Sequence, residues 1–488
     1  MRQGTVALRE RGRLAALFAT VVHQARRQAG WQEPDRRTLR TWRQFVLGVL
    51  VARSTRLVVV GQAVLGQRAA RSVKAVAMAL GSFLSVGLFP APTVSPQVLE
   101  AAVRQLDPTQ VATYRGKVVL ALDPTDYPKR SRGRSKTGRH MEHVGRVRKP
   151  VTGGKAKRRR RPPGRRPLGE APAVAGAPRP SAAPGAPPAA TVATTSGYVD
   201  VWTGLVLTGK QLLPLARALF SNRHPTLLSQ NKIEEAVLDA AWTLLERLGW
   251  AAILVADRAF GRKELLVALA TRWAQRRDFV IRVDADFTVF PAAPPADSAG
   301  ALLGDVLAAQ PVLGELVWDR GQEGTLRCET RTVAATIRFS RTGRQHDYTA
   351  ATLQFVELLP LDGVSDPLVL ATTLPLDTLA AVKGVVRVYS WRWAIETAFE
   401  TMKAWGLGRF MVRRWQAIDR LLWLVAVAYA LLVVAARDGP LAVLREQAER
   451  LLKRVAVLGR RLTVGKLAQA IGLDYQRHRR AWTTAWLT

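Results

Sequence analysis

The stretch VVLALDPTD (118–126) decides the class of fold. Its first five residues form a continuous apolar run, which is typical of a strand buried on both faces of a sheet, and Asp123 closes the run. A second run of this kind, AAILVA (251–256), is also followed by an aspartate, Asp257. A single aspartate after a strand is common turn chemistry. Two buried strands that each end at a carboxylate predict an α/β core that carries acidic groups.

The segments around AAILVA alternate between helical and extended patterns. IEEAVLDAAWTLLERLG (233–249) has the spacing of an amphipathic helix and is closed by Gly249. A further helix is predicted over 262–277 and a strand over 278–286. GYVDVWTGLVLT (197–208) predicts one long strand or a strand pair.

Residues 287–375 are expected to be mostly β, because short alternating runs there are separated by Gly, Pro and Asp turns. Helix is expected to resume over 376–404 and to continue towards the end of the chain. The chain shows no internal repeat.

Residues 1–95 are predicted to be helical and basic. Apolar positions recur at helical spacing in 41–52 and 72–84. The arginines that flank these segments are Arg36, Arg37, Arg40, Arg43, Arg53, Arg56, Arg68 and Arg71. A small DNA-binding domain and a helical bundle with a solvated basic rim fit this pattern equally well.

Residues 129–190 differ from the rest of the chain. They hold 18 Lys or Arg against two Glu and end in a Pro- and Ala-rich run. Such a composition lacks the apolar side chains of a core, so the segment is expected to be disordered. We assign the arginine-rich half an electrostatic role and interpret the Ala/Pro half as a tolerated loop.

The overall charge points to a polyanionic partner. The chain has 488 residues, with 73 Lys or Arg against 37 Asp or Glu, a net charge of +36. Folding does not require this excess and self-repulsion opposes it, so nucleic acid is the first candidate partner and an anionic membrane surface the second. The single cysteine, Cys328, excludes an internal disulfide and a cysteine-based zinc site.

Membrane insertion is not expected. The longest apolar run, Leu421 to Ala436, has sixteen residues, and a span needs about 20, so a buried helix is the better interpretation. Residues 14–22 lack the cleavage site of a signal peptide. We therefore expect a soluble cytoplasmic protein.

The strongest local signal is VVRVYSWRWAIETAFETMKAW (385–405). On one continuous helix at about 100° per residue, its polar groups fall in a stripe about 80° wide. These are Tyr389, Arg392, Glu396, Glu400 and Lys403. The opposite side carries Trp391, Ile395, Ala398, Met402 and Trp405. The sequence therefore predicts one buried face and one face that presents functional groups, although a solvated helix with an Arg392–Glu396 ion pair has the same pattern.

Asp123, Asp257 and Glu396 together suggest a site for hard cations. Mg²⁺ prefers oxygen ligands, and two such ions can clamp the attacking and leaving oxygens of a phosphodiester. Without metal the carboxylates repel one another, so one of them should have a raised pKa. Asp126 and Glu400 are the rival positions to Asp123 and Glu396.

The spacing Tyr389-x2-Arg392-x3-Glu396-x6-Lys403 resembles the Y-R-E-K signature of bacterial insertion-sequence DDE transposases, in the family numbered four. VADRAFG (255–261) is similar to that family's second-aspartate motif, and Asp123 after VVLAL matches the first. The resemblance covers about residues 115–435. It implies an RNase H-like core with acidic residues after the first strand, after the fourth strand and on a late helix. The long basic tract is not a usual feature of the family.

The resemblance also implies roles for residues. Asp123, Asp257 and Glu396 would hold two Mg²⁺ ions, with Mn²⁺ as a substitute. The DNA-binding side chains would be Tyr389, Arg392, Lys403, Arg258 and Trp318. Arg258 would support the acidic cluster, and Trp318 is a candidate for stacking on a flipped base, with plain packing as the simpler interpretation.

The implied function is cut-and-paste transposition by a homodimer that cleaves terminal inverted repeats and joins them to target DNA. A structure-specific nuclease of the same fold and an inactive DNA-binding protein are the alternatives. The expected units are a helical DNA-binding domain (1–110), an RNase H-like core (111–286 and 376–440), a disordered insertion (129–196), a β-rich insertion (287–375) and a C-terminal helical region (441–488).

Overall fold

The computed structural model describes most of the chain, with gaps. The described residues are 15–23, 36–65, 70–86, 91–129, 141–148, 194–226, 229–273, 277–290, 299–320, 324–340, 348–437, and 464–476 without 466 and 470. Expectations for the remaining residues, including nearly all of the basic tract and much of the C-terminal region, lie outside this description.

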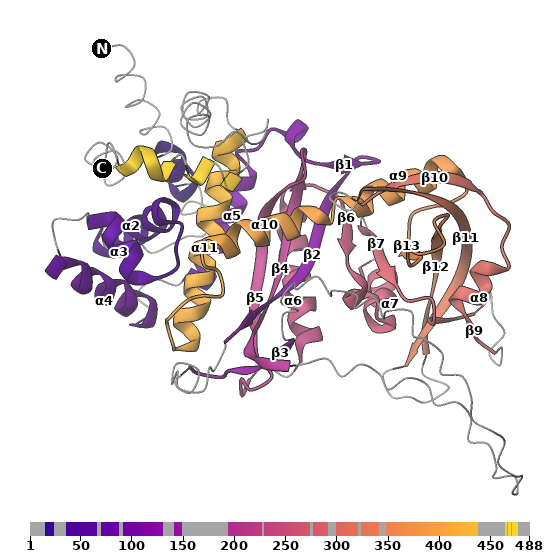
Figure 1. The fold of residues 1–488 in the computed structure, drawn as a ribbon, viewed down its shortest axis with the longest axis horizontal. Coiled ribbons are helices and arrows are strands. Elements are labelled where there is room, and N and C mark those ends of the chain that lie inside the picture. The colour runs from indigo at the N-terminus through magenta and orange to yellow at the C-terminus, as the bar shows by residue number, and fades with distance from the viewer. Residues whose placement is uncertain are drawn as a thin grey trace, which may run out of the picture.

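The centre of the protein is a mixed sheet flanked by helices (Figure 1). Its core strands are β2 (Lys117–Pro128), β4 (Thr194–Leu207), β5 (Gln211–Phe220), β6 (Ala252–Ala256) and β7 (Arg277–Val283). They lie in the order β5-β4-β2-β6-β7, antiparallel among β5, β4 and β2 and parallel from β2 through β6 to β7. This is the arrangement of an RNase H-like α/β fold, as the sequence predicted.

The β-rich residues 287–375 extend the same sheet. Four strands follow β7 in the order β13 (Leu368–Thr372), β12 (Tyr348–Pro360), β11 (Thr325–Ser340) and β10 (Gly314–Asp319), with β13 paired to β7. The prediction of mostly β structure is confirmed. The short elements β8 (Thr288–Val289), β9 (Ala301–Leu302) and α8 (Leu303–Ala308) lie beside them, and β1 (Thr113–Tyr114) pairs with β2.

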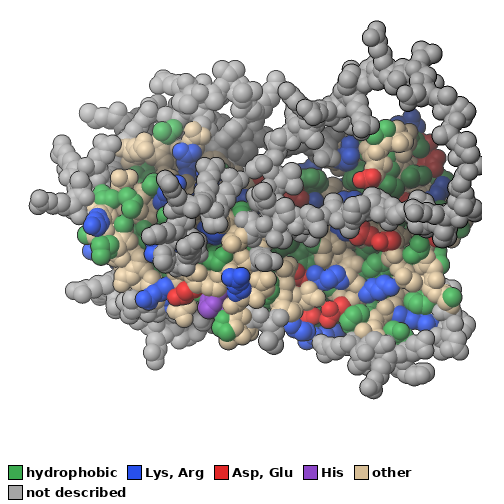
Figure 2. All heavy atoms as spheres, turned by 60° about the horizontal axis from the view of Figure 1, so that its bottom comes forward, with side chains coloured by type: hydrophobic (Ala, Val, Ile, Leu, Met, Phe, Trp, Pro, Cys, Tyr) green, Lys and Arg blue, Asp and Glu red, His purple; other side chains and the backbone are tan. Residues whose placement is uncertain are grey.

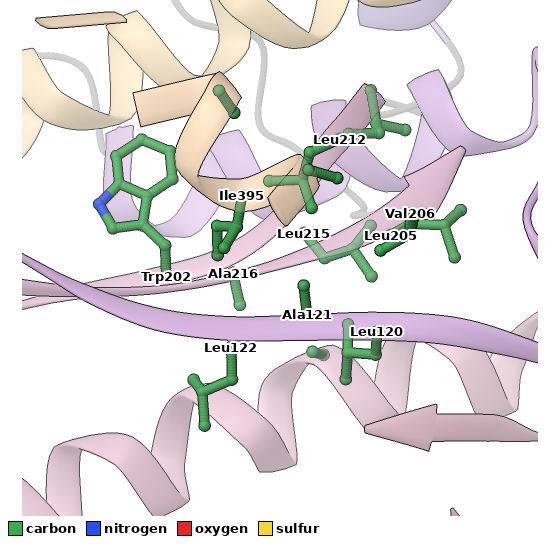
Figure 3. Close-up of a cluster of buried hydrophobic side chains, with 14 of the residues drawn as sticks. Leu120, Ala121, Leu122, Trp202, Leu205, Val206, Leu212, Leu215, Ala216 and Ile395 are labelled. Carbon is green, nitrogen blue, oxygen red and sulfur yellow. The ribbon is translucent and has the colours of Figure 1, made fainter. Parts of the chain in front are cut away.

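Helices cover both faces of the core strands. Figure 3 shows Ile395 and Trp202 on one face of β2, whereas Leu122 points to the helices on the other. The first face is covered by α10 (Trp393–Ala404), which packs against β2, β4 and β5. Two helices follow core strands, α6 (Gln230–Arg247) and α7 (Lys263–Thr271), and α9 (Leu379–Ser390) precedes α10.

The predicted helix over 233–249 forms as α6 because both of its ends carry termination signals. The Ser229 side chain accepts a hydrogen bond from the Lys232 amide, which caps the N-terminus. Gly249 has a φ of +74°, the left-handed conformation that favours glycine just past a helix end. The helix predicted over 262–277 is shorter, since α7 ends at Thr271 and β7 begins at Arg277.

The helical N-terminal prediction is confirmed for the described residues. The helices are α2 (Arg36–Ala52), α3 (Leu57–Leu65), α4 (Ala70–Val86) and α5 (Ala91–Val103). Helices α2, α4 and α5 pack against α11 (Trp415–Arg437). Among the described residues, α11 alone is long and apolar enough by itself to span a membrane, but 89% of its most apolar window is buried in the protein. It is therefore a core helix, as expected for Leu421 to Ala436.

Two boundary predictions are wrong. The buried strand does not end at Asp123, because β4 keeps pairing with β2 as far as Pro128. The disordered insertion predicted over 129–196 is interrupted by an ordered segment at 141–148, where β3 (Gly145–Arg148) pairs with β4. The basic composition concealed this strand, since its order comes from pairing with a distant segment and not from its own apolar content.

A buried ion pair joins the antiparallel strands to α11. Asp200 on β4 and Arg217 on β5 are 2.8 Å apart, and neither side chain has exposed surface. Tyr127 and the Trp202 indole donate hydrogen bonds to the same carboxylate, at 3.0 and 2.6 Å. Arg217 also reaches Asp419 on α11, at 2.7 Å. Every charge in this network has a partner, which offsets the cost of removing it from water.

We expect Asp200→Ala to lower the free energy of unfolding by about 3–5 kcal/mol, because Arg217 would lose its fully buried partner. Urea unfolding of the purified protein measures this loss. Glu315→Ala is the control, since Glu315 forms an exposed pair with Arg327 and should cost at most about 1 kcal/mol. Equal losses in the two variants would contradict this role for Asp200.

Candidate active site

Asp123 occupies the point where β2 loses one of its neighbours. The parallel pairing of β2 with β6 stops at Leu122, opposite Ala256, so Asp123 is the first residue of β2 beyond it. On the other side Asp123 is paired with Trp202, whose ring meets Phe399 of α10 with centroids 6.0 Å apart. Leu122 points to the opposite face (Figure 3), and neighbouring residues alternate, so Asp123 faces α10.

The pleat of β2 separates Asp123 from its rival Asp126. The register of β2 with β4 is regular from Leu120 to Pro128. Residues three apart in a strand point to opposite faces, so Asp126 faces away from α10. Only Asp123 can meet groups carried by that helix.

Asp257 directly follows β6, at the carboxyl end of the strand next to β2. It precedes a turn of 3-10 helix, Arg258–Phe260, and its side chain forms no capping hydrogen bond there. Gly261 then approaches β7 closely, because a Cβ at this position would lie 2.6 Å from the carbonyl oxygen of Arg282. The absence of a side chain at Gly261 lets the turn that carries Asp257 sit against β7.

The single helix predicted for residues 385–405 is wrong. The structure has two helices, with α9 ending at Ser390 and α10 beginning at Trp393. Tyr389 therefore lies in the last turn of α9, Arg392 in the junction and Glu396 in the first turn of α10. The predicted buried face holds for Ile395, Ala398, Met402 and Trp405, which have at most 2% of their surface exposed.

Two of the residues predicted on the presented face are buried instead. Tyr389 and Arg392 are only 5% and 6% exposed. Arg392 pairs with Glu396 at 2.5 Å, as the i, i+4 spacing predicted. The Nε atom of Arg392 is buried and has no hydrogen-bond partner among the described residues. This guanidinium therefore keeps a donor available for a further acceptor.

The electrostatics show that the acidic residues share one site. Burial raises the pKa of Asp123 to about 7, with Glu396 and Asp257 adding to the rise and Arg392 and Lys403 opposing it. The expected raised pKa is therefore found. Burial opposes the charge of Arg392, yet its pKa is held above the ordinary value by Tyr389, Glu396, Asp257 and Asp123.

The two rival glutamates differ in their surroundings. Glu396 is paired with Arg392 and acts on Asp123, whereas Glu400 is exposed, one turn further along α10. Glu400 lines a separate hollow together with Arg53 and Trp405. Lys403 is exposed and lies close enough to lower the pKa of Asp123. The structure thus brings Glu396, and not Glu400, to Asp123.

Two other predicted residues have their contacts outside the three carboxylates. Arg258 is exposed and pairs with Asp284 at 2.9 Å, not with the acidic cluster. Trp318 lies on β10, the edge strand, with Arg320 placed 5.8 Å from its ring centroid. The packing interpretation of Trp318 agrees with its contact to the hydrophobic core.

Arg282 on β7 is a site residue that the sequence analysis missed. Ala256 is paired with Ile281, which places Arg282 beside Asp257 at the next step along the sheet. Arg282 also acts on Tyr389, whose pKa burial raises and the two cations Arg392 and Arg282 lower. No ion pair of Arg282 is found within the described part of the chain. A single arginine within a strand forms no recognisable sequence motif. Only the pairing of β6 with β7 shows that Arg282 lies beside Asp257.

The three carboxylates suit a hard metal ion, because all of them supply oxygen ligands. Asp257 and Glu396 also lie near enough to Asp123 to raise its pKa. The three carboxylates do not, however, converge on one point at which a metal ion could bind. Among the residues that the structure describes, no three Asp, Glu, His or Cys side chains are grouped tightly enough to hold an ion. Glu396 is instead engaged with Arg392.

Comparison with known families agrees with this geometry. Residues 235–431 match the family model described as the transposase DDE domain. The chain therefore carries a transposase DDE domain over these residues. The match includes Asp257 and Glu396 and begins after Asp123. No curated protein matches the chain. Transposases of this kind act on DNA and generally use divalent metal ions.

The pH dependence of stability should report the burial of Asp123. Its pKa is about 7 in the folded state and about 3.8 when exposed, so the folded chain holds an extra proton between these values. Stability without metal should therefore fall as pH rises from about 4 to 7. In EDTA, Asp123→Asn should show a smaller fall than the original chain. Equal slopes of unfolding free energy against pH would contradict the assignment.

Proposed function

We propose that this transposase cleaves the ends of a mobile element and joins them to target DNA by a cut-and-paste route. The observation that carries the proposal is the meeting of Asp123, Asp257 and Glu396 beside Arg392. Acidic groups suit metal binding, and the adjacent cation suits a DNA phosphate. The assignment to insertion-sequence family four belongs to this proposal.

The three carboxylates would hold two Mg²⁺ ions, or Mn²⁺ in their place. Bound there, the ions would supply activation of the nucleophile and stabilisation of the leaving oxygen in phosphodiester displacement. Glu396 would turn from Arg392 towards the aspartates, and Arg392 would then be released for the DNA. Asp123 is half-buried, and the partial removal of water around it strengthens its charge interactions.

The cations around the carboxylates would hold the DNA backbone. Arg392 offers its unpartnered Nε, Lys403 lies exposed on α10, and Arg282 lies beside Asp257. Tyr389 would orient Arg392, which lies 5.8 Å from its ring centroid, and its hydroxyl would contact the same phosphate. Arg258 and Trp318 would contact DNA farther from the reacting phosphate.

A nuclease of the same fold and an inactive DNA-binding protein remain the alternatives. Strand transfer into a second duplex would distinguish the transposase from the nuclease. An inactive protein would bind DNA with an affinity independent of both Mg²⁺ and Glu396. A transposase must cut and join two ends together, so we propose that it acts as a homodimer on paired ends.

Glu396→Ala should abolish cleavage of a duplex that carries the DNA flanking the coding region, because a metal ligand is lost. Glu400→Ala is the matched control on the same helix, and it should cleave normally because Glu400 faces a different hollow. Gel analysis of nicking with and without Mg²⁺ measures both variants. Cleavage retained by Glu396→Ala would refute the site, and loss in both variants would remove its specificity.

Arg392→Ala should weaken binding to the same duplex and reduce its dependence on salt, because one phosphate contact disappears. The slope of log affinity against log salt should become shallower by about one. Fluorescence anisotropy over a range of salt concentrations measures the slope. An unchanged slope would show that Arg392 serves the carboxylates alone.

A further inference from the structure

A second cluster of rings lies at the far end of β2, away from the carboxylates. His143 precedes β3, His224 follows β5, and Trp415 begins α11. The ring centroids of His143 and His224 are 4.5 Å apart, as are those of His224 and Trp415. All three side chains are half-buried, so each keeps some ring surface exposed. We call these three residues the aromatic platform.

The platform packs on buried aromatic rings. Tyr198 lies 5.8 Å from Trp415 and 6.4 Å from Phe410, and both Tyr198 and Phe410 are buried. Lys129 Nζ lies 3.3 Å from the centroid of the Phe410 ring and donates a hydrogen bond to the carbonyl of Gly408. The inner rings therefore serve packing, and the outer three rings extend the stack to the surface.

The backbone around the platform is held in a costly conformation. His143 has a φ of +52°, a region that non-glycine residues rarely adopt. Ser221 Oγ donates to the His143 carbonyl, Glu142 N donates to the Arg413 carbonyl, and the Glu142 carboxylate accepts from Trp415 N at 2.7 Å. These bonds fix three separate segments around the two imidazoles. Strain of this kind concentrates at functional sites.

The rim of the platform is basic. Arg223, Arg413 and Arg414 are exposed, and no ion pair of theirs is found among the described residues. Figure 2 turns the lower end of the sheet towards the viewer and shows a histidine at the surface with both Lys or Arg and Asp or Glu side chains near it. Burial lowers the pKa of His224, and the neighbouring His143 lowers it further. The uncharged His224 imidazole can stack on a nucleobase, and the nearby arginines can bind the adjoining phosphate. This combination suits a nucleotide better than it suits a phosphate group alone.

The platform lies within reach of DNA held at the active site. Pro128 lies five residue steps beyond Asp123 on β2, a distance of roughly 17 Å along the strand. The platform side chain Trp415 begins α11, which follows α10 after a connection of ten residues. DNA that crosses the carboxylates along β2 would reach these rings within a few nucleotides.

We propose that His143, His224 and Trp415 form a stacking surface for unpaired DNA bases, with Arg223, Arg413 and Arg414 holding the phosphates of that strand. Aromatic faces stack on any base, but only where the base is not already stacked inside a duplex. The ligand is therefore single-stranded or opened DNA beside the cleavage point. This assignment rests on the proposed action on DNA and adds a contact that duplex binding does not need.

The test compares three labelled probes with the full-length protein by fluorescence anisotropy. The first is a blunt duplex, the second carries a short single-stranded tail, and the third carries an abasic tail of equal length. The original chain should bind the base-bearing tail at least about fivefold more tightly than the abasic tail, the effect of one base stack. His224→Ala should lose this preference and keep its affinity for the blunt duplex.

Two variants serve as controls. His224→Phe should retain the preference, because it keeps a ring in place, and His23→Ala should retain it because His23 lies on an N-terminal segment. Arg413→Ala should weaken binding of both tails equally, which tests the rim separately should His224→Ala fail to fold. An original chain that binds base-bearing and abasic tails alike would overturn the platform. Absence of binding to all three probes would instead refute the proposed action on DNA.

Discussion

The side chains of Asp200 and Arg217 meet in the core with no exposed surface, and the arrangement of the antiparallel strands of the sheet depends on them. The pair ties β4 to β5, Tyr127 adds β2, and Asp419 adds α11. Trp202, which donates to the same carboxylate, is the strand partner of Asp123. A contact that looks purely structural therefore determines how the candidate catalytic aspartate is presented to α10.

The break between α9 and α10 is the second constraint. A continuous helix would place Tyr389, Arg392 and Glu396 on one stripe at its surface. The junction instead lets Tyr389 and Arg392 sink into the protein while Glu396 stays half-buried beside them. Arg392 thus reaches Glu396, Asp257 and Asp123 at once, and its charge makes it possible to gather carboxylates that would otherwise repel one another.

The sequence predicted the strands well, because an apolar run that ends at a charge is a strong signal for a buried strand. It failed where long-range pairing decides the outcome. The continuation of β2 beyond Asp123, the pairing of β3 and the place of Arg282 all depend on segments distant in the chain. The helix junction was also invisible, since apolar residues keep helical spacing through Trp391 and Ile395. Four signature residues at matching spacing led to the proposed site chemistry, whereas no spacing in the sequence indicated the cluster of His143, His224 and Trp415.

Gly261 has a consequence for how copies of a mobile element age. Copies that escape selection accumulate substitutions, and every amino-acid replacement of a glycine adds a side chain. At Gly261 even a methyl group would collide with the carbonyl of Arg282, part of a strand that cannot yield without disturbing the sheet. The turn that carries Asp257 would then be displaced although every acidic residue remained. A genomic copy that keeps all the acidic residues but has another residue at position 261 is therefore expected to be inactive. Gly261 has no chemical role of its own, yet its presence is needed for the element to move.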